Sequence, residues 1–188
     1  MAIEIKIIPY ADVTSELKAT IDSFGKENFD TSEAIDPSMQ EQIQEWYFAK
    51  PTHYFLAYEK EILVGSAILQ FRDISFEGCT YKMAGFGGLA VSKKHRRMGI
   101  GSKLLEERIR FSLEQNADVG FLNTDINAVG HIFSRFGFVP LGRNYSFIGK
   151  SGVLHEDDSG MICSLRNCEL FDAIRERDEP FFIGESNI

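Results

Sequence analysis

The amino-acid sequence predicts one α+β domain with about six or seven strands and about four helices. Its 188 residues are 44% apolar and 12% aromatic, which is enough to bury one core of ordinary size. Strand-like and helical apolar patterns alternate along the chain, with no internal repeat or linker between them. We therefore expect a single domain over 1–188, with its core at about 3–165 and a C-terminal extension over 166–188.

The N-terminal part predicts one strand followed by two helices. Apolar and polar residues alternate over 3–7, which is typical of a strand with one solvent-facing side. Helical spacing of apolar residues over 12–24 predicts an amphipathic helix, with Asp12 as its N-cap. After a polar and acidic loop over 28–36, a second helical pattern covers 37–47.

The middle of the chain predicts three strands and a helix. Residues 54–58 and 62–71 are apolar runs joined by a short polar link, and the second run is apolar on both faces, as in a central strand. A long strand over 79–91 is interrupted by three glycines, which indicates a bulge or a close approach to its backbone. An amphipathic helix follows over 102–115.

The last part predicts two short strands around a helix and a final strand. Strand patterns cover 119–123 and 138–141, and a short helix lies between them over 128–136. Residues 161–165 predict a last strand, whereas 166–188 show no clear period.

Composition and charge exclude several protein classes. The chain has no apolar run long enough to cross a membrane, and its start lacks the features of a signal peptide, so we expect a cytoplasmic protein. The net charge of -8 and the pI near 5.1 disfavour nucleic acid as a partner and favour a cationic substrate. The spacing of Cys79, Cys163 and Cys168 disfavours disulfides and a zinc site.

A basic, glycine-containing loop between strand 79–91 and helix 102–115 predicts a phosphate site. Unpartnered amides at a helix start attract anions, and glycine lets the backbone approach closely. Alternatively, the charges form a solvated surface and the glycines shape a turn. Gly101-Ser102-Lys103 does not have the order of a P-loop, which disfavours nucleotide hydrolysis. The cations of the loop are Lys93, Lys94, Arg96 and Arg97.

The segment Arg96-Arg97-Met98-Gly99-Ile100-Gly101 is similar to the R/Q-x-x-G-x-G/A signature of the GNAT superfamily of acyl-CoA N-acyltransferases. The strand residues 88–91 before it and the segment 127–138 after it also resemble that family, so the likeness covers about 54–141. It implies a three-layer αβα fold with a mixed, mostly antiparallel sheet that splays at the cofactor site.

The resemblance implies acetyl-CoA as co-substrate and no metal. The pantetheine arm would hydrogen-bond to the strand backbone, and helix-start amides would hold the diphosphate. Asn127 resembles a polar residue that contacts the cofactor, although it could equally be a helix N-cap. The implied cofactor-binding residues are Leu89, Ala90, Val91, Arg96, Arg97, Met98, Gly99, Ile100, Gly101, Ser102 and Asn127.

The implied reaction is direct attack of an amine on the thioester, without a covalent enzyme intermediate. An alkylamine with a pKa of about 10.4 needs a base or a water path before it can attack. A backbone amide at Leu89 or Ala90 would stabilise the oxyanion. The usual tyrosine acid is replaced by Phe133 and a glutamate base by Gly87, which leaves Asp125, His131, Tyr145 and Glu77 as candidate proton handlers.

The implied partner is a small-molecule amine, and we expect a homodimer. A likeness to aminoglycoside 2'-N-acetyltransferases rests on the acidic turn around Asp157 and Asp158 and on an acidic loop with Asp30, Glu33 and Asp36. Acidic side chains suit a polycationic sugar, although 157–160 could equally be a plain turn. The chain end at 182–188 lacks that family's tryptophan. A non-catalytic acyl-CoA-binding or sensing domain is the alternative of another class.

Overall fold

The structure is a computed structural model that describes residues 2–28 and 37–188, within which the chain forms five α-helices and ten strands. The helices are α1 (Ser15–Asn28), α2 (Pro37–Trp46), α3 (Ile100–Glu114), α4 (Ile126–Ser134) and α5 (Cys168–Glu176). The strands are β1 (Ile3–Pro9), β2 (His53–Glu59), β3 (Ile62–Phe76), β4 (Cys79–Val91), β5 (Val119–Asn123), β6 (Val139–Pro140), β7 (Tyr145–Ile148), β8 (Leu154–Asp157), β9 (Gly160–Ser164) and β10 (Phe182–Glu185).

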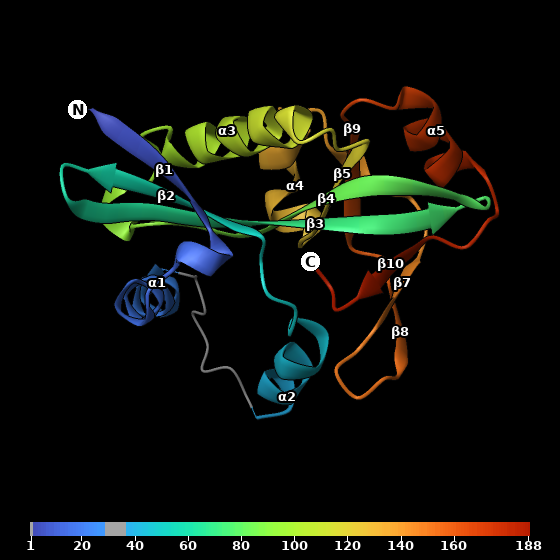
Figure 1. The fold of residues 1–188 in the computed structure, drawn as a ribbon, viewed down its shortest axis with the longest axis horizontal. Coiled ribbons are helices and arrows are strands. Elements are labelled where there is room, and N and C mark those ends of the chain that lie inside the picture. Colours follow the sequence, from blue (N-terminus) through green and yellow to red (C-terminus); the bar gives the residue numbers. More distant parts are fainter. Residues whose placement is uncertain (1, 29–36) are drawn as a thin grey trace.

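A seven-stranded sheet in the order β1-β2-β3-β4-β5-β9-β6 forms the middle layer. Within the described part of the chain its strand pairs are antiparallel, except for the parallel pair β4 and β5. Figure 1 shows α1 and α2 on one side of this sheet and α3 and α4 on the other. The expected three-layer α+β fold with a mixed, mostly antiparallel sheet is confirmed.

The core divides according to the face of the sheet, because neighbouring side chains of a strand point to opposite faces. Under α3 and α4, a cluster joins Leu104 and Leu105 to Phe55 and Ala84. On the other face, Ile21 of α1 packs with other residues against β2. The helix periodicity read from the sequence thus identified real buried stripes.

A smaller sheet in the order β10-β7-β8 lies beside the large one, and the sequence did not predict it. Its strands are four residues long, and α5 and this sheet form a second cluster with β5 and β9. Residues 168–188, expected as an extension, therefore contribute to the core. Four-residue strands within 145–157 and 182–185 offer too few alternations for a clear period.

Three local predictions of the sequence need correction. Asp12 is no N-cap, since it ends a short 3-10 turn and α1 begins only at Ser15. There the Thr14 hydroxyl accepts a hydrogen bond from the Leu17 amide at 3.2 Å. Asn127 is not the N-cap of α4, because Asp125 accepts from the Ala128 amide at 2.9 Å. Leu113, expected in the core, is 40% exposed.

No described helix is long and apolar enough to cross a bilayer.

Candidate active site

The parallel strands β4 and β5 separate halfway along their length and leave a cavity between them. Their pairing ends at Gly85 and Phe121, while β5 continues beside β9 up to Asn123. The cavity has a volume of about 330 Å³ and is mostly apolar. Its lining residues are Phe86, Gly87, Gly88, Leu89, Arg108, Asn123, Thr124, Val129, Ile132, Phe133 and Ile188.

A β-bulge gives β4 its irregular backbone at this cavity. Between the pairs formed with Ser66 and Ile68 of β3, the two residues Gly88 and Leu89 occupy the space of one. Gly88 has φ +58°, a left-handed conformation that favours glycine. The glycine interruption seen in the sequence is therefore a bulge, and it directs one wall of the cavity.

The start of α3 follows β4 after a basic turn. Gly99 is the N-cap residue with φ +79°, and no side chain caps the helix there. Arg97 also has a positive φ, +64°, which is uncommon for a residue with a side chain and costs free energy. The turn thus presents the first amides of α3 to solvent rather than to a capping oxygen, as an anion site requires.

The basic loop is anchored to the end of α1. Arg96 donates from Nη2 to the carbonyl of Asn28 at 2.8 Å, and the Lys93 amide donates to the Asn28 side chain at 3.1 Å. Asn28 is buried at 9% exposure, whereas the loop residues Lys93 and Arg96 that bond to it are exposed. Arg96 thus ties the loop to α1, and Arg97 and Met98 are exposed beside the helix start as well.

Arg108 of α3 is a completely buried charged residue in the cavity wall. Its exposed fraction is 0%, and Nη1 donates to the carbonyls of Ile68 at 3.2 Å and Gly87 at 3.1 Å. Nη2 has no hydrogen-bond partner within the described residues. Burial lowers the pKa of Arg108 to about 9, so the guanidinium keeps its proton at neutral pH.

A polar network joins the end of β5 to α2 and to the small sheet. Asn123 accepts from the Tyr47 hydroxyl at 3.0 Å. Its amide nitrogen lies 2.8 Å from the Tyr145 hydroxyl and 3.0 Å from Asp157 Oδ2. Tyr145 in turn donates to Asn187 at 2.9 Å. Polar groups from five segments thus meet at one end of the cavity.

The candidate proton handlers lie outside the cavity lining. Asp125 caps α4 and is exposed, and His131 is exposed on the same helix. Glu77 sits in the turn between β3 and β4, where it pairs with Arg177. Tyr145 is 1% exposed and reaches the cavity only through Asn123. Phe133, at the position of the usual tyrosine acid, does line the cavity.

The expected substrate-binding residues fall into two groups. Asp30, Glu33 and Asp36 lie outside the described residues. Asp157 ends β8, and its Oδ1 accepts a hydrogen bond from the Ser159 amide at 2.7 Å, whereas Asp158 is exposed. Asn127 is exposed on α4. In the described parts of the chain, no three His, Cys, Asp or Glu side chains are grouped as metal ligands.

Tyr145 should make stability fall at alkaline pH. Burial and the nearby Asp157 raise its pKa well above the ordinary value near 10. The unfolded chain then ionises first, so the stabilisation is present below about pH 10 and is lost as pH rises beyond it. We expect Tyr145→Phe to lower the free energy of unfolding by about 1–2 kcal/mol at pH 7. Above about pH 10 the free energy of unfolding of this variant should fall less steeply with pH than that of the wild type. Urea unfolding from neutral to alkaline pH tests this, and equal slopes would contradict it.

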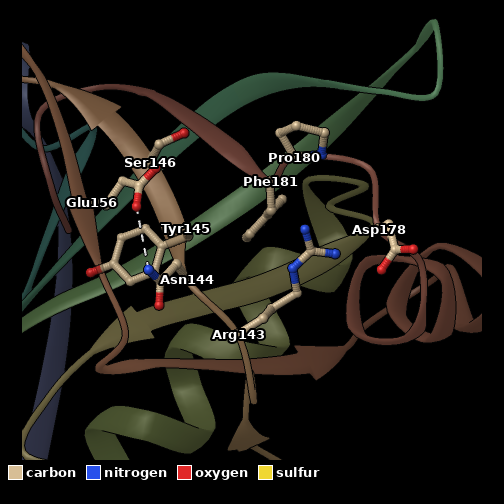
Figure 2. A pocket seen from close by; sticks show the side chains of 8 residues that line it. All are labelled: Arg143, Asn144, Tyr145, Ser146, Glu156, Asp178, Pro180 and Phe181. Atoms are coloured by element: carbon tan, nitrogen blue, oxygen red, sulfur yellow. Dashed lines mark hydrogen bonds between the residues drawn. The ribbon is translucent and has the colours of Figure 1, made fainter.

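A second hollow of about 180 Å³ lies at the small sheet (Figure 2). Arg143 points across it, but the guanidinium donates to the backbone carbonyls of Ile174, Arg177 and Glu179. Asn144 donates to Glu156 at 3.3 Å. Because these side chains already bond to the protein, the cavity between β4 and β5 is the better candidate site.

Arg108 and Asn123 line the cavity, and sequence reasoning did not single out either of them. Arg108 stands beside polar residues of α3, so its sequence context did not mark it as buried. A helical wheel places it four residues after Leu104 on the core-facing stripe, which was the available signal. Asn123 closes a strand pattern, where a polar residue is ordinary.

Comparison with known proteins identifies the family. The model of the Acetyltransferase (GNAT) family matches residues 19–138, which is more than half of the chain. No curated protein matches the sequence.

Solved structures with the same fold have low sequence identity. A GNAT family N-acetyltransferase from Escherichia coli in complex with CoA has a TM-score of 0.61 and 16% identity, covering 98% of this chain and 91% of its own. An aminoglycoside acetyltransferase from an uncultured soil metagenomic sample has a TM-score of 0.52 and 19% identity over 73% and 91%. A probable N-acyltransferase from Enterococcus faecalis has 0.58 and 16% over 78%, and the chain spans about a third of its length, 34%. Such likenesses show the fold.

Proposed function

The chain belongs to the GNAT acetyltransferase family, and from this we propose that it transfers an acetyl group from acetyl-CoA to a primary amine of a small cationic molecule. The cavity between the separated strands β4 and β5, continuous in sequence with the uncapped start of α3, carries this proposal. The CoA complex of a protein with the same fold supports the choice of cofactor.

The cofactor would lie along β4 from the helix start to the cavity. The first amides of α3 would hold the diphosphate, with Arg97 beside it. The pantetheine arm would pair with the β4 backbone beyond Gly85, where β5 no longer does. Val91 stands between these two parts, since it ends β4 immediately before the basic turn.

The bulge amide of Leu89 would stabilise the oxyanion. Leu89 lines the cavity, whereas Ala90 is 4% exposed and pairs with Ser66 of β3. The neutral amine would attack the thioester carbon and form the C–N bond, with the carbonyl electrons moving to the oxygen. The oxyanion would then collapse, the C–S bond would break with its electron pair on the sulfur of coenzyme A, and the amine proton would pass to water. No side chain of the protein takes the acetyl group in this scheme.

The amine would approach from the Asn123 end of the cavity, where Asp157 offers a negative charge. The two amide hydrogens of Asn123 face three oxygens, those of Tyr145, Asp157 and Ser159. Asp157 Oδ2 therefore keeps capacity to accept a hydrogen bond from a cationic group. This favours polyamines or amino sugars over neutral amines.

The direct test follows free thiol release from acetyl-CoA with aminoglycosides, polyamines, amino acids and peptides as acceptors. We expect turnover with at least one cationic amine and a mass increase of one acetyl group on it. Tight acetyl-CoA binding without release across the panel would support the non-catalytic alternative. That alternative is favoured by one observation, since Arg108 is the only ionisable side chain among the described residues that line the cavity.

Replacing Asp157 should weaken binding of the amine selectively. We expect Asp157→Asn to raise KM for the cationic amine by about tenfold, as the loss of one charge-assisted hydrogen bond would. KM for acetyl-CoA should change little. Asp158→Asn, the exposed neighbour, is the matched control and should leave both constants unchanged. Equal KM values in the two variants would rule out Asp157 as the amine contact.

A further inference from the structure

The buried guanidinium of Arg108 indicates a role beyond folding. A charge removed from water is costly unless it is paired, and the chain places this one where its exposed fraction is 0%. Burial lowers the pKa of Arg108, and within the described residues no Asp or Glu side chain forms a salt bridge with it. Buried ionisable groups with shifted pKa values gather at functional sites.

The hydrogen bonds of Arg108 hold the bulge of β4. Nη1 bridges the carbonyls of Ile68 and Gly87, which stand on β3 and β4 at the edge of the bulge. Nε lies 3.4 Å from the Leu104 carbonyl, and the guanidinium carbon lies 5.2 Å from the centre of the Phe86 ring. The side chain is thereby fixed on three sides beneath the strand that carries Leu89.

The charge of Arg108 faces a cavity without any other ionisable side chain. The described lining residues hold no Asp, Glu, His, Lys, Cys or Tyr, and Phe133 offers no proton at the usual position of the acid. A thiol has a pKa of about 8.5, so a sulfur that leaves without a proton needs its negative charge stabilised. Arg108 is the group available to do this.

We propose that Arg108 is a positioning residue that fixes the bulge through Gly87 and leaves a positive charge without a side-chain salt bridge beside the thioester, so that coenzyme A departs as a thiolate without a protein acid. This inference rests on the proposed function. The C–S bond breaks with its electron pair on sulfur, and the amine proton goes to water. Arg108 gives up no proton and need not touch the substrate.

The test is the pKa of the thiol of coenzyme A bound to the protein, measured from thiolate ultraviolet absorbance. The complex with desulfo-coenzyme A serves as the blank, because it removes the signal of the three protein cysteines. We expect the bound thiol to titrate about one unit or more below 8.5 in the wild-type protein, since a nearby cation favours the thiolate. Arg108→Met should bring the pKa to about 8.5 or above.

Two further variants separate charge from packing. Arg108→Lys keeps the charge and should keep the thiol pKa low, even if the protein melts at a lower temperature. Arg110→Met removes an exposed arginine of the same helix and should match the wild type. A purely structural role of Arg108 would change the melting temperature and leave the bound thiol pKa unchanged.

The outcomes distinguish this inference from the proposed function. If coenzyme A does not bind the wild-type protein, both fall. If it binds and its thiol titrates at about 8.5 or above in the wild type, only the role of Arg108 is overturned, and this result needs no variant to fold. An equal low pKa in the wild type and in folded Arg108→Met would overturn it as well.

Discussion

The variant Gly99→Asp should lose acetyl-CoA affinity by about 100-fold or more. Gly99 precedes the uncapped amides of α3, so a carboxylate there would occupy and repel the proposed diphosphate position. A repulsion of about 3 kcal/mol, typical for like charges close together near a surface, corresponds to that loss. Isothermal titration calorimetry at low and high salt measures it, and salt should reduce the difference.

Two controls separate the charge from the backbone conformation of Gly99. Gly99→Asn introduces a side chain of the same size as aspartate but without its charge. Asparagine tolerates the positive φ of 79° at this position, so we expect a much smaller loss of acetyl-CoA affinity. Gly78→Asp introduces the same carboxylate at φ +75° in the β3–β4 turn, and it should bind acetyl-CoA normally. Unchanged affinity in Gly99→Asp would refute the diphosphate site.

The variant Arg72→Met should lower the free energy of unfolding by about 3 kcal/mol. Arg72 of β3 donates to the carbonyls of Ile183, Ser186 and Asn187, which tie the last segment of the chain to the sheet. Burial lowers the pKa of Arg72 to about 10, which leaves the guanidinium charged at neutral pH. In Arg72→Met the three carbonyls lose this charged donor. Urea unfolding measures the change.

The same variant should loosen one wall of the candidate site. Ile188 lines the cavity. Its side chain fills the space that a Cβ atom at Gly85 would need, and its Cδ1 atom lies 2.4 Å from the position of that Cβ. We expect faster amide hydrogen exchange over 182–188 in Arg72→Met. Arg110 is exposed, so Arg110→Met should lower the free energy of unfolding by only about 0.5 kcal/mol or less. Equal free energies of unfolding of Arg72→Met and Arg110→Met would contradict the anchoring of the last segment by Arg72.

The segment proposed to bind the cofactor was predictable because its signal is local. The glycines of β4, the basic turn and the start of α3 lie within 85–103, and their backbone conformations follow from the residues themselves. A bulge among the glycines of β4 was one of two stated expectations, and it lies at Gly88; α3 begins at Ile100, two residues before the predicted start, with Gly99 as its N-cap. Both glycines have positive φ. The bounds of β4 and β5 agreed with the sequence as well, since long apolar runs and strand alternation need no partner to be recognised.

The reacting end of the site was not predictable, because it is made by residues far apart in the chain. Asn123 meets Tyr47, Tyr145 and Asp157 only after β7 and β8 pair beside β5. Asp125 and His131 are the right residue types on the right segment, yet the turn of α4 leaves both exposed. Residue type alone does not say which side chains point into a cavity.

By itself the sequence determined the family, the strands that border the cavity and the basic turn before α3, because each depends on spacing and backbone preference within a short segment. Only the tertiary structure decided that Arg108 is buried without a salt bridge to a described side chain and that Ile188 lines the cavity. Both facts depend on which distant elements pack together, here α3 under β3 and β4 and the last segment against Gly85. Long-range packing sets burial, and burial sets the electrostatics on which the chemistry depends.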